Sequence, residues 1–431
     1  MKSQSVNVKT EFISAITTFL AMMYIIVVNP LILADAGIPY AAALTATITV
    51  SAIGCILMGV FANNPIAVAP GMGINAFFTY AIVVHMQISW QVALGVVFWS
   101  GVIFTILSIL NLRTYIIRAI PQQIRYAVVS GIGLLIAVIA LKSADVVMPS
   151  QTNMIQMAPL NLSYILFLLG LLVVGILLYH RVKGALIISI LLTSTLYFMV
   201  TVFFPEVGDH IKWQGIFSMP DFSIFFQLDL ISSLSIALWP AIFAFLFTTL
   251  FDSLSGLIGV CEAGQLLDKN GDPRNIKEAL TVDAISGVLS GLFGTSSAVS
   301  YIESAAGIEE GAKTGLNAIF VGLLFLPFLF FAPLLSMVPK VATAPALMIV
   351  GVYMMKMVTK IQWTKIDEAL PAILIILIIP LSSSITHGII LGIIMWLLMK
   401  FFTKQRDQID ITLTIIGVLS LLLLIIEAIS I

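Results

Sequence analysis

The sequence predicts an all-α polytopic membrane protein, with 14 transmembrane segments arranged as two inverted repeats of seven. The first observation behind this prediction is composition, because 60% of the 431 residues are hydrophobic and 10% are charged. Soluble domains carry roughly 45–50% apolar and about 25% charged residues, so this chain has too little polar surface to be one. The second observation is the spacing of the apolar segments, and the third is the placement of the basic residues.

The apolar segments form two sets of seven, on the criterion of about 20 mostly apolar residues for a spanning helix. The first set lies at 13–33, 41–61, 66–85, 91–110, 124–141, 162–180 and 184–204. The second set lies at 233–261, 278–293, 297–311, 316–337, 341–357, 369–382 and 385–401. The two predicted repeats are therefore 1–205 and 233–402. The first segment is longer than a signal-peptide core of roughly 7–15 residues, so we expect it to be retained.

Two further stretches connect or follow the repeats. The interval 206–232 is polar and carries four acidic residues, which predicts a connection on the extracellular side. The end of the chain, 403–431, contains an apolar stretch at 411–431 that is long enough to span a bilayer. Two interpretations of this tail stay open. It is either a fifteenth helix or a hydrophobic tail that lies against the bundle.

The basic residues give the orientation. Cytoplasmic loops carry an excess of Lys and Arg, and with the N-terminus inside, 17 of the 20 basic residues fall on the cytoplasmic side. The three on the outer side are Lys142, Lys212 and Lys340. An error of one span near the middle would reverse this bias in the second half, so the bias supports the count. A repeat with an odd number of spans must lie inverted relative to its copy.

Several classes of function are excluded by what the sequence lacks. The net charge is -1 and no basic block is present, so nucleic acid is not an expected partner. The two cysteines, Cys55 and Cys261, and the four scattered histidines form no metal-binding spacing. The sequence around Gly71 and Gly73 lacks the strand–helix–strand context of a dinucleotide site. With no catalytic triad spacing or Walker motif, we expect no cofactor, no metal and no enzymatic activity.

Two acidic residues in apolar surroundings are the strongest candidates for a functional site. Asp252 lies in the middle of the eighth segment, and Glu303 follows a run of Gly, Ser and Thr residues in the tenth. A carboxylate in hydrocarbon costs several kcal/mol unless it is paired or hydrated, so such residues mark functional sites by default. The alternatives are a structural acid bonded to hydroxyls for Asp252 and a surface loop for Glu303. A third acid, Asp283, is expected to form a structural pair.

The third segment is interrupted in the same way as the tenth. Two prolines and two glycines break the apolar stretch 64–78, which also contains Asn75. Backbone that is not helical survives at membrane depth only where it lines a cavity or is buried in protein. Paired broken segments at corresponding positions of two halves indicate a transporter's substrate site. The Asn75 amide could bond a donor and an acceptor edge of a ligand, or it could form a helix cap or an interhelical bond.

At these positions the sequence resembles the AzgA-like purine permeases of the nucleobase/ascorbate transporter superfamily. The resemblance spans nearly the whole chain and rests on five stretches: TTFLAMMYI at 17–25, APGMGINAFF at 69–78, FDSL at 251–254, GTS followed by SYIESAAG at 294–307, and ATAPALMIVG at 342–351. Two features depart from the family pattern. Ser255 and Gly256 stand where a Gly-Thr pair is usual, and 297–299 is less rich in Thr than expected.

The resemblance implies a division of the fold and a substrate. A core domain would comprise 1–110 and 233–339, and a gate domain 111–205 and 340–402. Segments 3 and 10 would each contain a short strand and a half-helix, with a purine base (adenine, guanine or hypoxanthine) held between them. The polar contacts carried over to this chain are Asn75, Asp252 and Glu303. The pocket would be shaped by Tyr301, by the backbone at Gly73 and Ala76, and by Ala21 of the first segment.

The function expected from these features is secondary active transport of purine bases across the plasma membrane. Asp252 and Glu303 are the expected groups for proton coupling, in either assignment of roles, because a carboxylate can be charged when empty and neutral when loaded. Sodium coupling is the less favoured alternative. A permease of the same fold for a pyrimidine, xanthine or a small anion is the alternative function, followed by a passive channel or an intramembrane enzyme. The oligomeric state stays open, with a homodimer as one alternative.

Overall fold

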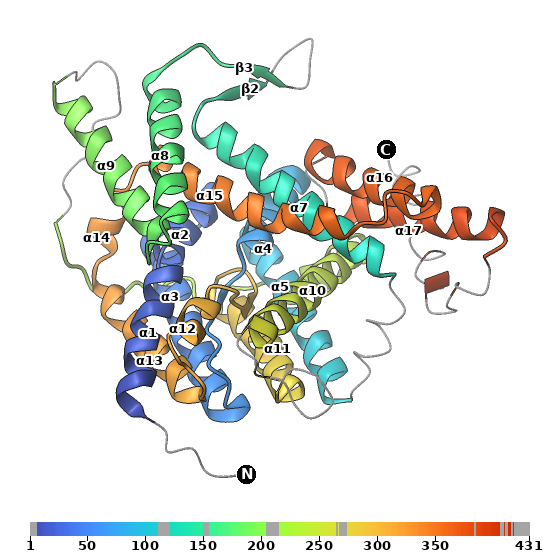
Figure 1. Cartoon of the computed structure of the whole chain (residues 1–431), viewed down its shortest axis with the longest axis horizontal. Helices are drawn as coiled ribbons and strands as arrows, with labels where there is room; N and C mark the ends of the chain where they lie inside the picture. Colours follow the sequence, from blue (N-terminus) through green and yellow to red (C-terminus); the bar gives the residue numbers. More distant parts are fainter. Residues whose placement is uncertain are drawn as a thin grey trace.

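A computed structural model describes residues 7–110, 121–149, 155–203, 215–263, 266, 274–382, 385–405, 409, 413–414 and 417. These residues form a helical bundle with two short pairs of strands (Figure 1). Among them, eight helical stretches have the length and apolar character needed to cross a membrane, and three shorter apolar helices accompany them. The predicted tail at 411–431 lies almost wholly outside the described residues.

The first half of the chain contains the elements expected from its apolar segments, with several segments divided. It consists of α1 (Val8–Met22), α2 (Ile25–Asp35), α3 (Tyr40–Leu57), the π-helical turn η1 (Met58–Ala62), β1 (Val68–Pro70), α4 (Met72–Ala76), the π-helical segment η2 (Phe77–His85), α5 (Trp90–Ile109), α7 (Gln122–Ser143), β2 (Val147–Pro149), β3 (Ile155–Met157), α8 (Leu162–Tyr179) and α9 (Ala185–Phe203). The predicted first segment is thus two helices that meet at Met23 and Tyr24.

The second half is divided more strongly. It consists of the 3₁₀ turns η4 (Ser232–Leu234) and η5 (Ile236–Leu238), α10 (Trp239–Ala263), α11 (Ile276–Phe293), β4 (Ala298–Ser300), α12 (Ser304–Glu309), α13 (Gly315–Phe325), η6 (Leu326–Phe330), α14 (Ala332–Leu335), α15 (Lys340–Met355), η7 (Lys356–Lys360), α16 (Ile366–Ser382) and α17 (Ile385–Phe402). The predicted span 316–337 is therefore a helix that ends at Phe325 and continues as short turns. Pro327 and Pro333 lie in those turns, where the missing N–H of proline breaks the helical ladder.

The strands β1 and β4 pair antiparallel in the middle of the bundle, with Val68 opposite Ser300 and Pro70 opposite Ala298. All the residues of both strands are buried. Their positions are those that the resemblance implied for segments 3 and 10, and each strand is followed by a short helix, α4 or α12. The second strand pair, β2 with β3, joins α7 to α8. The sequence predicts an all-α protein with short strands in segments 3 and 10 only, so the β2–β3 hairpin shows that this prediction is wrong in one detail.

The helices pack as two groups, and each group combines elements from both halves of the sequence (Figure 1). In the first group, α11 packs on α5 and α3, and α13 packs on α3 and α1. In the second group, α15 packs on α7, α8 and α9, and α16 packs on α7 and α17. The first group contains α1–α5 and α10–α14 with the strands β1 and β4. The second contains α7–α9 and α15–α17.

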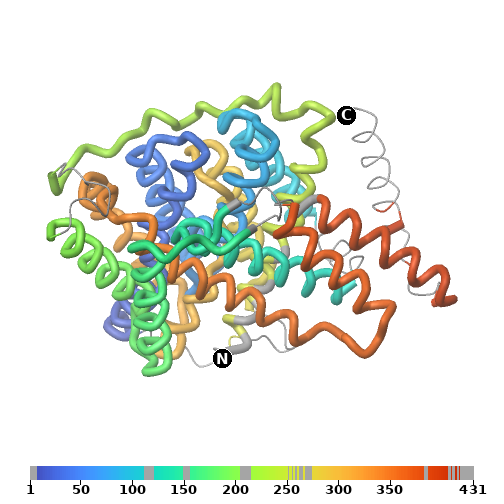
Figure 2. Tube along the Cα trace, turned by 90° about the horizontal axis from the view of Figure 1, so that it is seen from above, coloured from blue at the N-terminus to red at the C-terminus, as the bar shows by residue number. Residues whose placement is uncertain are grey.

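The described part of the connection, 215–232, is an ordered strap across the first group. Figure 2 shows this yellow-green chain running along the top of the view. Backbone N–H groups of the strap donate to Phe330, Leu292 and Gln91 carbonyls, and that of Asp221 donates to the Thr45 hydroxyl. Hydrogen bonds from the side chain and backbone of Ser232 hold the pKa of Asp229 below its ordinary value. These bonds fix the strap to the ends of α3, α5 and α11.

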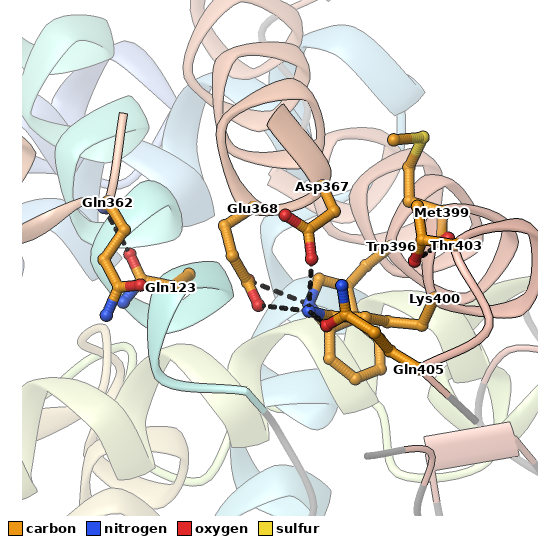
Figure 3. A network of polar contacts seen from close by, with 9 residues as sticks. All are labelled: Gln123, Gln362, Asp367, Glu368, Trp396, Met399, Lys400, Thr403 and Gln405. Carbon is orange, nitrogen blue, oxygen red and sulfur yellow. Dashed lines mark hydrogen bonds and ion pairs between the residues drawn. The ribbon is translucent and has the colours of Figure 1, made fainter. Parts of the chain in front are cut away.

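A buried lysine joins the ends of α16 and α17 in the second group (Figure 3). Lys400, whose side chain is 2% exposed, bonds Asp367 at 2.6 Å and Glu368 at 2.7 Å. The other Glu368 oxygen accepts from the Trp396 indole at 3.0 Å, and Gln405 accepts from Lys400 at 2.9 Å. A buried ammonium with these partners satisfies both acids at the start of α16.

Candidate functional site

A cavity of about 140 Å³ lies between the two groups of helices, next to the β1–β4 pair. One water occupies roughly 30 Å³ in the liquid, so the cavity has room for a small molecule. Its wall from the first group includes Tyr24, Gly71, Met72, Gly73, Asp252, Gly256, Val299, Ser300, Tyr301, Ile302 and Glu303. Its wall from the second group consists of Val129, Val350, Tyr353, Met354 and Met357. Ile302 is 55% exposed and Tyr353 is 40% exposed, so the cavity is open beside them.

Asp252 reaches the cavity from α10 and lies against the end of β1. A Cβ atom added to Gly71 would lie 3.1 Å from the Asp252 Oδ2 atom. The absence of a side chain at Gly71 therefore allows the carboxylate to approach the backbone between β1 and α4. Gly256, one turn later on α10, gives a similar close approach, because a Cβ there would lie 2.7 Å from the Ser300 carbonyl oxygen. The two glycines bring α10 directly against the strand pair.

Glu303 lies at the N-terminal cap position of the short helix α12, three residues after the end of β4. The Tyr24 hydroxyl donates a hydrogen bond of 2.8 Å to Glu303 Oε1. Tyr24 comes from the break between α1 and α2 and is only 1% exposed. The carboxylate is thus held from one side by the first segment and lines the cavity with the rest of its surface.

The strand pair is the frame that fixes the relative positions of these groups. The Tyr301 hydroxyl donates to the Pro70 carbonyl at 2.6 Å, and the Tyr301 N–H donates to the Ala67 carbonyl at 2.9 Å. The Gly71 N–H donates to the Ser297 carbonyl at 3.1 Å. Segments 3 and 10 are therefore bonded to each other on both sides of the short strands, so Glu303 is fixed relative to α4.

Asp283 forms the structural pair expected from the sequence. It is fully buried on α11 and accepts hydrogen bonds from Ser300, one from the hydroxyl at 3.0 Å and one from the N–H at 3.2 Å. These bonds attach β4 to α11. Asp283 does not line the cavity.

The structure brings four of the seven predicted site residues together and places three elsewhere. Asp252, Glu303, Tyr301 and Gly73 line the cavity. Asn75 is fully buried, with its amide Nδ2 at 3.9 Å from the Met72 sulfur and its Oδ1 without a hydrogen-bond partner among the described residues. Ala76 is 2% exposed on α4, and Ala21 is partly buried on α1, one turn before Tyr24. A role in binding for these three stays a prediction.

Three residues that line the cavity are absent from the predicted site: Tyr24, Tyr353 and Met354. Tyrosine and methionine within apolar helices are ordinary core residues, so neither composition nor spacing singles them out. The one available signal for Tyr24 is Pro30, because a proline within a helix removes a backbone bond and is typical of a bend upstream.

A second, larger cavity of about 1010 Å³ lies between the groups at the other end of α15. Lys340 begins α15 and forms an ion pair with Asp35, the last residue of α2. The Tyr80 hydroxyl also donates to Asp35, at 2.8 Å. All three residues line this cavity. Tyr353, in contrast, lies 13 positions along α15, which is about 20 Å at 1.5 Å per residue.

Comparison with known proteins identifies the family of this chain. Residues 9–391 match the sequence model of the Permease family. The chain belongs to that family. Adenine permease AdeP of Escherichia coli (strain K12) is 38% identical over 98% of this chain and 94% of its own length. Guanine/hypoxanthine permease PbuO of Bacillus subtilis (strain 168) is 39% identical over 93% of both chains. The resemblance to purine permeases, based on residues 17–351, is thereby confirmed.

The fold of this permease has a counterpart among solved structures. It superposes on the transmembrane domain of the cyanobacterial bicarbonate transporter BicA with a TM-score of 0.64, over 90% of this chain and 98% of that one, at 16% identity. The described helices therefore have the arrangement of a membrane transporter. This permease is a multi-pass membrane protein, and the relatives named here are permeases, in agreement with the absence of any enzyme motif.

Proposed function

We propose that the protein is a secondary active transporter that imports purine nucleobases, in the plasma membrane and with its N-terminus in the cytoplasm. The observation that carries this proposal is a cavity between two groups of helices into which two carboxylates open, Asp252 and Glu303. Permeases with 38% and 39% identity are named for adenine and for guanine and hypoxanthine, which supports this substrate class. A planar base with several N–H donors suits a wall that contains two acceptors.

Glu303 is the proposed direct ligand of ring N–H groups, and Asp252 is the proposed proton carrier. Glu303 already accepts a hydrogen bond from Tyr24, which orients one edge of the carboxylate. Asp252 lies against Gly71 at the junction of β1 and α4. A change in the charge of the Asp252 carboxylate therefore changes the electrostatic potential at the N-terminal end of α4. A proton that neutralises Asp252 would allow the loaded site to move without a bare charge in the bilayer.

Alternating access is proposed to arise from movement of the first group against the second. In this proposal the first group is the core domain, the second is the gate domain, and the 14 segments form two inverted repeats. The packing supports it, because each group draws on both halves of the chain. The strand pair belongs wholly to the first group, so Asp252 and Glu303 would move together as one unit.

A permease for an anion is the weaker candidate. BicA, which shares the fold, is named for bicarbonate. The described residues that line the cavity include two acids and no Lys, Arg or His, so an anion would meet repulsion in this site. A pyrimidine, or the dioxopurine xanthine, would face the same two acceptors as adenine, guanine or hypoxanthine, and is separated from them by uptake measurements alone.

The test is uptake of labelled adenine, guanine, hypoxanthine and uracil in cells that lack their own purine permeases, with and without a protonophore. We expect a purine to accumulate, and the protonophore to abolish the accumulation. Asp252→Asn and Glu303→Gln should each reduce uptake at least tenfold, which corresponds to about 1.4 kcal/mol or more. Asn cannot take up and release the proton, and Gln replaces a charged acceptor by a weaker, neutral amide oxygen. Glu309→Gln is the matched control, because Glu309 is an exposed acid on the same helix as the cap residue Glu303.

Three outcomes would contradict parts of this proposal. Uptake of uracil alone would replace the purine by a pyrimidine. Uptake that equilibrates without accumulation would indicate a passive channel. Full accumulation by both acid variants would remove Asp252 and Glu303 from the mechanism.

A further inference from the structure

We infer that Tyr24 determines which bases the site prefers, because its hydrogen bond limits how the Glu303 carboxylate can pair with a ligand. Tyr24 is a positioning residue in this inference, which rests on the proposed function. The site would favour a base that presents one N–H donor at the edge facing Glu303 over a base that presents two adjacent donors.

The position of Tyr24 makes it a rigid donor. It lies in the break between α1 and α2, is 1% exposed, and its backbone carbonyl accepts from the N–H groups of Val27 and Val28. A phenol hydroxyl that donates to a carboxylate forms a charge-assisted bond, which is stronger than a bond between neutral groups. The bond to Glu303 Oε1, at 2.8 Å, is therefore expected to persist when a ligand enters.

The hydrogen bond from Tyr24 changes how the Glu303 carboxylate can pair with a ligand. A carboxylate with both oxygens free accepts two parallel N–H donors side by side, as it does from a guanidinium group. In this site Oε1 already accepts from Tyr24, and the partly exposed Glu303 side chain lines the cavity. A ligand with two adjacent donors would therefore have to share Oε1 with the Tyr24 hydroxyl, which weakens the second of its two bonds, whereas a ligand with one donor could use Oε2 without sharing.

Hypoxanthine and guanine differ in the number of adjacent N–H donors that they could present to Glu303. Both present N1–H next to a carbonyl oxygen, but guanine adds an exocyclic amino group beside N1–H. Hypoxanthine therefore has a single donor at that edge and guanine has two adjacent donors. In wild-type protein we expect tighter binding of hypoxanthine. Removal of the Tyr24 hydroxyl should favour guanine, since a ligand donor at Oε1 would no longer share that oxygen with Tyr24.

The experiment measures the affinity of purified full-length protein for hypoxanthine and for guanine, by isothermal titration calorimetry. Tyr24→Phe should shift the ratio of the two dissociation constants toward guanine by about tenfold. Tyr40→Phe is the matched control, because the Tyr40 hydroxyl is buried and has no hydrogen-bond partner among the described residues. It should leave the ratio unchanged. In a Glu303→Gln background the effect of Tyr24→Phe on the ratio should vanish.

The outcomes separate this inference from the proposed function. If wild-type protein binds neither base nor adenine, the proposed function fails and the inference fails with it. If wild-type protein binds purines but Tyr24→Phe weakens both bases in parallel, or leaves the ratio unchanged, only the inference is overturned. A merely structural role of Tyr24 predicts the parallel loss. Tyr24→Leu removes the same donor with a different side chain and supplies a second measurement of the ratio if Tyr24→Phe does not yield folded protein.

Discussion

Gly71 is the residue whose small size has the most direct effect on the candidate site. Alanine there would place its Cβ 3.1 Å from Asp252 Oδ2 and 3.0 Å from both Ile74 Cδ1 and Val299 Cγ2. The backbone of Gly71 is extended, so alanine would add crowding without backbone strain. We expect Gly71→Ala to displace the carboxylate by a few tenths of an ångström and to weaken binding of a purine about tenfold, as measured by calorimetry.

Gly175→Ala is the control for this substitution. Gly175 also belongs to an apolar segment, within α8, and a Cβ there would meet no atom within 4 Å. It should leave the affinity unchanged. Equal affinities in the two variants would show that the approach of Asp252 to Gly71 has no part in binding.

The sequence reveals site residues of one kind only. Asp252 and Glu303 could be predicted because an ionisable group in an apolar segment is expensive unless it has a function. Asn75 is predicted on other grounds, from the donor and acceptor of its amide in a broken segment and from the resemblance. Its side chain is fully buried and is not among the residues that line the cavity, and its role in binding stays a prediction. Tyr24 and Tyr353 could not be predicted. A tyrosine gains its role from the partner that folding brings to it, and Glu303 is 279 positions away from Tyr24.

At the scale of the elements, the α16–α17 hairpin depends on the Lys400 cluster (Figure 3). Lys400→Met would leave Asp367 and Glu368 as two neighbouring, largely buried acids without their cation. Breaking a buried pair by removal of one partner costs roughly 3–5 kcal/mol, so we expect a clearly lower melting temperature of the detergent-purified protein. Lys404→Met, at an exposed position four residues later, is the matched control and should melt as wild type. Identical melting of both variants would contradict this role.

The boundaries of the elements follow the sequence more closely than their internal breaks do. Prolines and glycines at 64–73 mark the interruption of the third segment, and the strand and short helix found there agree with what the resemblance implied. The break at Tyr24 and the turns after Phe325 were missed because hydropathy measures apolar content, which is the same for a broken helix and a continuous one. The β2–β3 hairpin was missed because it lies in a connection, where hydropathy carries no signal.

At the scale of the whole molecule, the positions of apolar helices could be predicted, but the grouping of helices could not be worked out from them. Spans arise from local composition, whereas the packing of α13 on α1 joins residues about 300 positions apart. Between helices in lipid the hydrophobic effect gives little preference for one partner over another. Small residues decide instead, as at Gly59 and Gly315, where a Cβ on either glycine would lie within 2.4 Å of the other's carbonyl oxygen.

Movement of the two groups against each other predicts that contacts between them must open during transport. The ion pair of Asp35 with Lys340 joins α2 of the first group to α15 of the second. Asp35→Cys with Lys340→Cys, treated with a short bifunctional thiol reagent, should therefore lose purine uptake.

The control pair is Asp35→Cys with Tyr80→Cys, since Tyr80 also contacts Asp35 but belongs to the first group. This pair, cross-linked within one moving unit, should retain uptake. The native cysteines, Cys55 and Cys261, are buried and should not compete for the reagent. Uptake that survives the first cross-link, verified by mass spectrometry, would rule out relative movement at this contact and would restrict the conformational change to the other end of α15.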